Sequence, residues 1–142
     1  MEKIFIYYSL TGTGDYVADY LSKNGYDIRK VKTKEPLPKN KFLSIIVGGY
    51  KAMRSYKDKL DSFNYDIKKY DEVIIGSPVW NDRLSSPINT VLDNINLTDK
   101  KVSFILYSGS GKCTKAKEQI NKKCPNSKII DIKTLEDIKK LI

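Results

Sequence analysis

The chain has 142 residues, with 26 Lys and Arg, 17 Asp and Glu, no histidine, and a formal net charge of +9. This length suits one folded domain, which we expect to span residues 1–142. The lack of histidine excludes catalytic triads with a histidine base and metal sites with histidine ligands. Two cysteines, no secretion-signal pattern and no apolar run of membrane-spanning length favour a cytoplasmic location.

Short apolar runs alternate with helical patterns along the chain. The runs predict strands at 4–8, 27–31, 72–76, 102–107 and 128–132. Helical spacing predicts helices at 13–24, 86–95, 113–124 and 134–141. Residues 40–60 are expected to form a helix with a disturbed middle, because Gly48 and Gly49 interrupt its apolar spacing. The charged strand at 27–31 is expected at an edge of the sheet.

This alternation predicts a doubly wound α/β domain, with a five-stranded parallel sheet and helices on both faces. In such sheets ligands bind beyond the carboxyl ends of the strands. Three loops with ligand-type residues follow strands here, at 9–14, 77–83 and 108–112. We therefore expect these three loops to meet at one edge of the sheet.

The first loop has the composition of a phosphate site without lysine. Ser9, Thr11 and Thr13 offer hydroxyl groups, while Gly12 and Gly14 let the backbone approach a ligand. The loop opens a helix, whose N-terminus exposes free N–H groups and a partial positive charge. The alternative is an ordinary connection between a strand and a helix.

The second and third loops suit a flat aromatic ligand. Trp80 follows Pro78 and Val79 at a strand exit, where a core aromatic is less expected, although a core position remains the alternative. Asn81 is a residue type that tolerates positive φ. The third loop reads Ser108-Gly109-Ser110-Gly111, and the alternative for its glycines is that they only form a turn.

Three other nucleotide or phosphate sites do not fit these residues. A dinucleotide fingerprint needs Gly or Ala where Val17 stands. A Walker loop needs Gly and Ser or Thr where Leu106 and Cys113 stand. A phosphorylated receiver domain needs acidic residues at the first and third strand ends, where this chain has Tyr8-Ser9 and Gly76-Ser77.

Taken together, the three loops resemble those of flavodoxins. Residues 9–12 match the start of that family's phosphate loop, and 76–80 are similar to its second loop, in which an aromatic covers the flavin ring. The resemblance implies noncovalent FMN and a sheet of order 2-1-3-4-5. The residues that it assigns to FMN are Ser9, Leu10, Thr11, Gly12, Thr13, Gly14, Pro78, Val79, Trp80, Asn81, Ser108, Gly109, Ser110 and Gly111.

The chain departs from the family pattern in three ways. Thr13 and Gly14 stand where the family often has Asn and Thr, which removes one hydroxyl donor. No aromatic lies between 108 and 114, so the second flavin face is expected to be open, or covered by Tyr50 or Tyr56. Family members are commonly acidic, whereas this chain is basic.

The positive charge is concentrated in residues 29–59, with ten Lys and Arg against two acids. Such a sector can attract an acidic protein, nucleic acid or an anionic membrane, or form a solvated surface. We expect redox protein partners, acidic ones given this sector, with no nucleic acid, no membrane and a monomeric state.

The resemblance implies an electron carrier that shuttles electrons through FMN between redox proteins. The alternative is an FMN-dependent NAD(P)H–quinone or nitro reductase, in which Lys51 and Arg54 would bind the nicotinamide phosphate. Such enzymes are usually oligomers and carriers usually monomers. A flavin-free interaction module that uses the basic sector is the third possibility.

Overall fold

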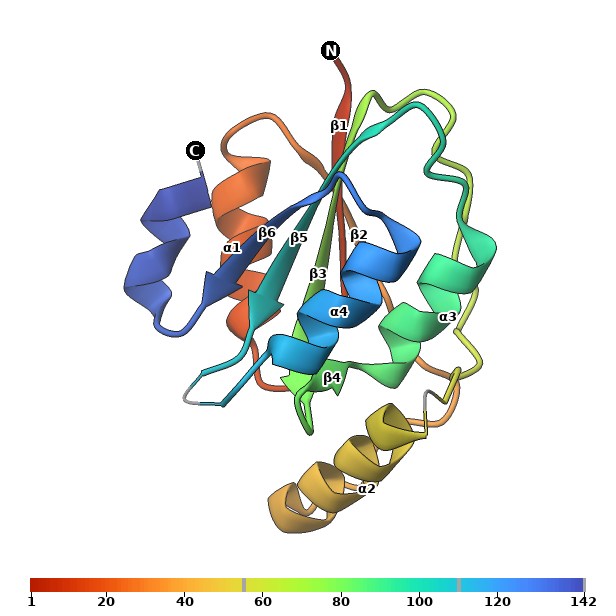
Figure 1. Cartoon of the computed structure of the whole chain (residues 1–142), viewed down its shortest axis with the longest axis vertical. Helices are drawn as coiled ribbons and strands as arrows, with labels where there is room; N and C mark the ends of the chain where they lie inside the picture. The colour runs from red at the N-terminus through yellow and green to blue at the C-terminus, as the bar shows by residue number, and fades with distance from the viewer. Residues whose placement is uncertain (55, 110, 142) are drawn as a thin grey trace.

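The computed structural model describes residues 1–54, 56–109 and 111–141. Figure 1 shows a central sheet with helices on both sides and one helix beyond its end. The elements are β1 (Lys3–Tyr7), α1 (Thr13–Ser22), β2 (Asp27–Lys30), α2 (Lys41–Met53), β3 (Glu72–Trp80), β4 (Arg83–Leu84), α3 (Ser86–Asn94), β5 (Lys101–Tyr107), α4 (Thr114–Lys123), β6 (Lys128–Ile132) and the 3₁₀ helix η1 (Leu135–Leu141). None of the helices in this part of the chain is long and apolar enough to cross a membrane.

The sheet confirms the predicted topology. Its parallel strands run in the order β2-β1-β3-β5-β6, so β5 and β6 are the fourth and fifth strands that the sequence predicts. The charged strand β2 lies at an edge, as expected. The short strand β4 was not predicted: it pairs antiparallel with the end of β3, with Val79 opposite Leu84 and Trp80 opposite Arg83.

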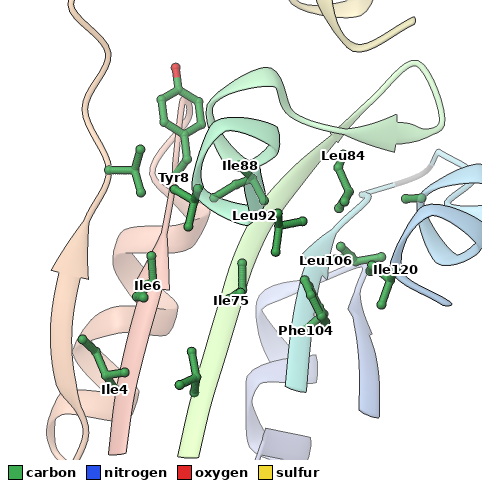
Figure 2. Packing of buried hydrophobic residues seen from close by; sticks show 14 of the residues in the cluster. Ile4, Ile6, Tyr8, Ile75, Leu84, Ile88, Leu92, Phe104, Leu106 and Ile120 are labelled. Atoms are coloured by element: carbon green, nitrogen blue, oxygen red, sulfur yellow. The ribbon is translucent and has the colours of Figure 1, made fainter. Parts of the chain in front are cut away.

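Alternate residues of β1 point to the two faces of the sheet and fill two separate cores. Ile4 and Ile6 join the core under α3 and α4, together with Tyr8 just beyond the strand (Figure 2). Phe5 and Tyr7 pack in the other core, with residues of α1 and η1. This period of two, with apolar residues on both faces, is what a strand buried between two layers of helices requires.

Helix α2 does not cover either face of the sheet. It lies beyond the carboxyl ends of the strands and projects from the body (Figure 1). The disturbed middle predicted for this stretch is wrong, because the helix runs without interruption through Gly48 and Gly49. Asn40 starts it by accepting hydrogen bonds from the N–H groups of Phe42 and Leu43.

Candidate functional site

The exits of β1, β3 and β5 are joined by contacts at the carboxyl edge of the sheet. Tyr8, which precedes the first loop, meets Trp80 of the second loop edge to face, with ring centroids 5.7 Å apart and planes at 89°. The hydroxyl of Tyr107, at the end of β5, donates to the carbonyl of Tyr8 at 2.9 Å. The three loops singled out from the sequence therefore do meet at one edge.

The first loop uses some of its backbone donors internally and leaves others available. The N–H groups of Gly12 and Gly14 both donate to Ser9 Oγ, each at 3.1 Å. Five further N–H groups, and two threonine hydroxyls, donate to no residue in the part of the chain that the structure describes. These are the amides of Ser9, Leu10, Thr11, Thr13 and Asp15 and the hydroxyls of Thr11 and Thr13. Free amides at a helix N-terminus form an anion site.

Gly12 and Gly14 suit their positions in the first loop for different structural reasons. Gly12 adopts φ 96°, a left-handed conformation that glycine takes without strain, and it has open space around it. A Cβ on Gly14 would lie 2.8 Å from each of Ser9 Cβ, the Tyr107 hydroxyl and the Tyr7 ring. Gly14 is buried, so its missing side chain makes room for protein packing, and a hydroxyl donor from Thr does not fit here.

The first turn of α1 carries one acidic residue, and a lysine neutralises it. Asp15 accepts hydrogen bonds from Tyr7 Oη at 2.6 Å and from Lys30 Nζ at 2.9 Å. Burial opposes ionisation of Asp15, but these hydrogen bonds outweigh it and hold its pKa below the ordinary value. Lys30 therefore limits the repulsion that Asp15 would exert on an anion at this helix N-terminus.

Trp80 lies between Tyr8 and helix α2, and part of its surface is exposed. Gly48 of α2 lies against the indole, because a Cβ on Gly48 would come within 3.2 Å of the ring atoms Cδ2 and Cε3. A Cβ on Gly49 would likewise lie 3.6 Å from the Cβ of Asn81. Helix α2 thus supports the second loop directly.

The tip of the second loop is a two-residue hairpin. Asn81 has φ 49°, which confirms the expectation of positive φ, and Asp82 has φ 64°. Two consecutive residues of this kind match the twist of paired strands, which explains why β3 continues into β4. The carbonyl of Asp82 accepts the N–H of Ala116 at 2.8 Å, so the hairpin is fastened to the start of α4.

The third loop is anchored to β6 by a polar cluster that the sequence did not reveal. Asp131 accepts hydrogen bonds from Ser108 Oγ at 2.5 Å and from Cys113 Sγ at 3.4 Å, and pairs with Lys133 Nζ at 3.2 Å. Burial opposes ionisation of Asp131, but these partners together hold its pKa below the ordinary value. Lys133 also lies 3.4 Å from the carbonyl of Gly111.

Gly109 and Ser110 are two further residues of the third loop that were assigned to FMN. Gly109 has φ 57° and open space around it, as an exposed turn residue would. Ser110 lies outside the described residues. The assignment of the fourteen residues to FMN stays a prediction.

Lys51 is not available for the phosphate of a nicotinamide cofactor. Its ammonium pairs with the buried Asp58 at 2.8 Å, and Ser86 Oγ donates to the other carboxylate oxygen at 2.5 Å. This cluster connects α2 to the start of α3. Tyr50 and Arg54 remain exposed on α2, and the Arg54 guanidinium lies 6.0 Å from the Tyr50 ring centre.

Sequence reasoning missed the residues that hold the loops in place. Tyr8 was taken only as the end of a strand, and Gly48 only as a break in a helix. A signal for Gly48 existed, since Ser44, Gly48 and Ala52 recur every four residues and form the buried stripe of α2. No sequence pattern indicated the cluster of Asp131 and Lys133. These residues come close to Ser108 only because β5 and β6 pair in the sheet.

Comparisons with known proteins agree on the family. The profile of the family described as flavodoxin matches residues 2–140. A flavoprotein of Bacteroides eggerthii DSM 20697 is similar in structure, with 23% identity, a TM-score of 0.75, and coverage of 98% of this chain and 94% of that one. A flavoprotein of Lactobacillus acidophilus NCFM, solved in complex with FMN, has 24% identity and a TM-score of 0.69, with 92% and 91% covered.

A more distant similarity in structure is to an azoreductase of Bacillus anthracis str. Sterne. It has 15% identity and a TM-score of 0.54, with 99% of this chain and 94% of that chain covered. No curated protein sequence matches the chain. The family profile spans nearly every residue, and the chain belongs to the flavodoxin family.

Proposed function

We propose that this protein binds FMN and transfers electrons through it. FMN is the cofactor of the flavodoxin family, and when bound it supplies one-electron or two-electron chemistry. The observation that carries the proposal is the meeting of three strand exits at one edge, where free amides lie near a partly exposed tryptophan. A ligand with an anionic tail and a flat ring suits this combination.

In this proposal each loop contacts a different part of the cofactor. The free amides and the threonine hydroxyls of residues 10–15 bind the phosphate group. Trp80 stacks on the flavin ring, and Gly48 behind it keeps the indole from turning away. Backbone groups near Val79, Asn81 and Gly109 address the polar edge of the ring.

We propose an electron carrier as the first form of this function, cytoplasmic and working between redox proteins. The ten cations of residues 29–59 support an acidic partner, because opposite charge speeds the encounter of two proteins. A stopped-flow measurement tests this form: the reduced, FMN-loaded protein should pass electrons to an acidic ferredoxin faster than to a basic cytochrome c of comparable size. The opposite order would reject an acidic partner.

An FMN-dependent reductase is the second candidate. The similarity in fold to an azoreductase supports it, together with the exposed Arg54 on the helix that lines the second loop. Mixing the FMN-loaded protein with NADPH separates the two forms. Fast direct bleaching of the flavin supports a reductase, and no bleaching supports a carrier.

A further inference from the structure

Helix α2 exposes an apolar surface that a protein in water would be expected to cover. Six apolar side chains of this helix are about half exposed or more: Phe42 (70%), Leu43 (49%), Ile45 (61%), Ile46 (50%), Tyr50 (58%) and Met53 (48%). Together they present roughly 600 Å² of surface, which is at the upper end of the largest patch that a monomer usually exposes, and such patches often serve a function. No other helix described in the structure exposes as many large apolar residues.

These side chains are spaced for contact with another helix. Leu43, Ile46, Tyr50 and Met53 follow one another at intervals of three, four and three residues. This is the spacing that places side chains along one seam between packed helices. The opposite stripe of α2, formed by Ser44, Gly48 and Ala52, is already buried against the body.

We propose that this face of α2 is the interface of a homodimer, in which α2 of one copy packs antiparallel against α2 of a second copy. A stable interface buries about 800 Å² on each partner, and the roughly 600 Å² of the apolar face of α2 is most of that area. Permanent interfaces are more apolar than transient ones, and the six side chains of this face are apolar, with Lys41 before them and Arg54 after them in the sequence. The second copy is the one partner that is always present at the chain's own concentration.

The charges along α2 oppose this arrangement only at its ends. Lys51 is already neutralised by Asp58, so it adds little repulsion. An antiparallel pair related by a twofold axis separates the two Lys41 side chains, but it brings each of them toward Arg54 of the second copy, a like-charge pair at either end of the interface. The net charge of +9 on each copy still opposes association, so salt should strengthen the dimer.

A dimer would also affect the cofactor site, because α2 is the element that supports Trp80. The second copy would hold α2 in place and would thereby fix Gly48 against the indole. A dimer differs from the monomer expected from the resemblance to flavodoxins, and it favours the reductase over the carrier. The inference itself needs no cofactor and goes beyond the proposed function.

The experiment is to measure the mass of the full chain, without FMN, by sedimentation velocity at 0.05 M and 0.5 M salt. The wild type should sediment as a dimer of 16.3 kDa chains, with a dissociation constant that falls as salt rises. Ile46→Glu should raise that constant at least 100-fold. Tyr16→Glu is the matched control, because Tyr16 is a 63% exposed aromatic on α1, and this variant should remain a dimer.

Three results would overturn the inference. A wild-type monomer at both salt concentrations would show that α2 does not pair. A dimer that survives Ile46→Glu would place the interface elsewhere, provided that circular dichroism shows both variants folded. Association with anionic phosphatidylglycerol vesicles that weakens with salt, from a wild-type monomer, would assign the face to a membrane. Failure of FMN binding leaves the dimer result intact, so the two proposals are tested separately.

Discussion

The strand-end loops and helix α2 lie side by side, yet they are held by different means. The loops continue from strands whose side chains fill two buried cores, and Tyr107 and Tyr8 connect them. The buried residues of helix α2 are all small, and its large apolar side chains are exposed. The loops are therefore positioned by the fold of one chain. Helix α2, in contrast, has an outer apolar face that no other described part of the chain buries.

This difference separates the two halves of the site. The half proposed to bind phosphate is built on β1 and α1, close to the core. The half proposed to bind the flavin ring depends on Trp80, which contacts Tyr8 and Gly48 of α2. Variants that alter one half and spare the other can measure how independent they are.

The largest expected effect is on the loop that is built on the core. Gly14→Ser places a Cβ within 2.8 Å of the Tyr107 hydroxyl and the Tyr7 ring, so we expect a loss of about 3 kcal/mol of folding stability. Urea unfolding measures this loss. Thr11→Ser, at an exposed position in the same loop, is the control and should leave stability within about 0.5 kcal/mol. Equal stability of the two variants would mean that Gly14 has space the structure does not show.

A somewhat smaller effect is expected at the contact that fastens α2. Asp58→Asn removes the negative charge that pairs with Lys51 and weakens the hydrogen bond that the carboxylate accepts from Ser86. We therefore expect a loss of about 2 kcal/mol of folding stability. Asp61→Asn changes an exposed carboxylate three residues away and should cost little. If both variants unfold at the wild-type urea concentration, the buried pair contributes nothing to holding α2.

Trp80 connects the two halves, and its removal should weaken FMN binding. Loss of stacking on an aromatic ring costs about 2 kcal/mol, so Trp80→Ala should raise the dissociation constant for FMN roughly 30-fold. Trp80→Phe keeps an aromatic face and should lose less. Flavin fluorescence titration gives both constants. Unchanged affinity in Trp80→Ala would remove the indole from the site.

The third loop should respond to pH through Asp131, with the smallest effect of this series. Because the pKa of Asp131 is lowered in the folded protein, its ionised form stabilises the fold above the ordinary carboxyl pKa. That stabilisation is lost as pH falls through the lowered value. Asp131→Asn should therefore flatten the fall of stability as the pH drops through and below the ordinary carboxyl pKa, relative to wild type. Parallel curves for the two proteins would contradict the assignment.

The fold was predictable because its signals are local. Apolar runs such as 72–76 mark buried strands, and the hydroxyl and glycine pattern after Tyr8 marks the first loop. The hairpin at Asn81 was missed, although two adjacent residues that tolerate positive φ are its signal. The role of Gly14 was misread, because the atoms that fill the space beside it include the hydroxyl of Tyr107, which is far away in sequence.

The position of α2 could not be predicted for a related reason. Its sequence is apolar on several sides, which in a single domain indicates a buried helix. Nothing in the spacing of residues 41–53 tells whether a neighbouring element of the same chain or another molecule covers the outer side. That choice is made by tertiary structure and by assembly.

The most direct test of the central claim compares FMN with riboflavin, which has the same ring and no phosphate. We expect the protein to bind FMN with quenched flavin fluorescence, and to bind riboflavin at least 100-fold more weakly, because the free amides of the first loop have no phosphate to bind. Equal affinity for the two ligands, or no binding of FMN, would contradict a phosphate site in the first loop beside the tryptophan.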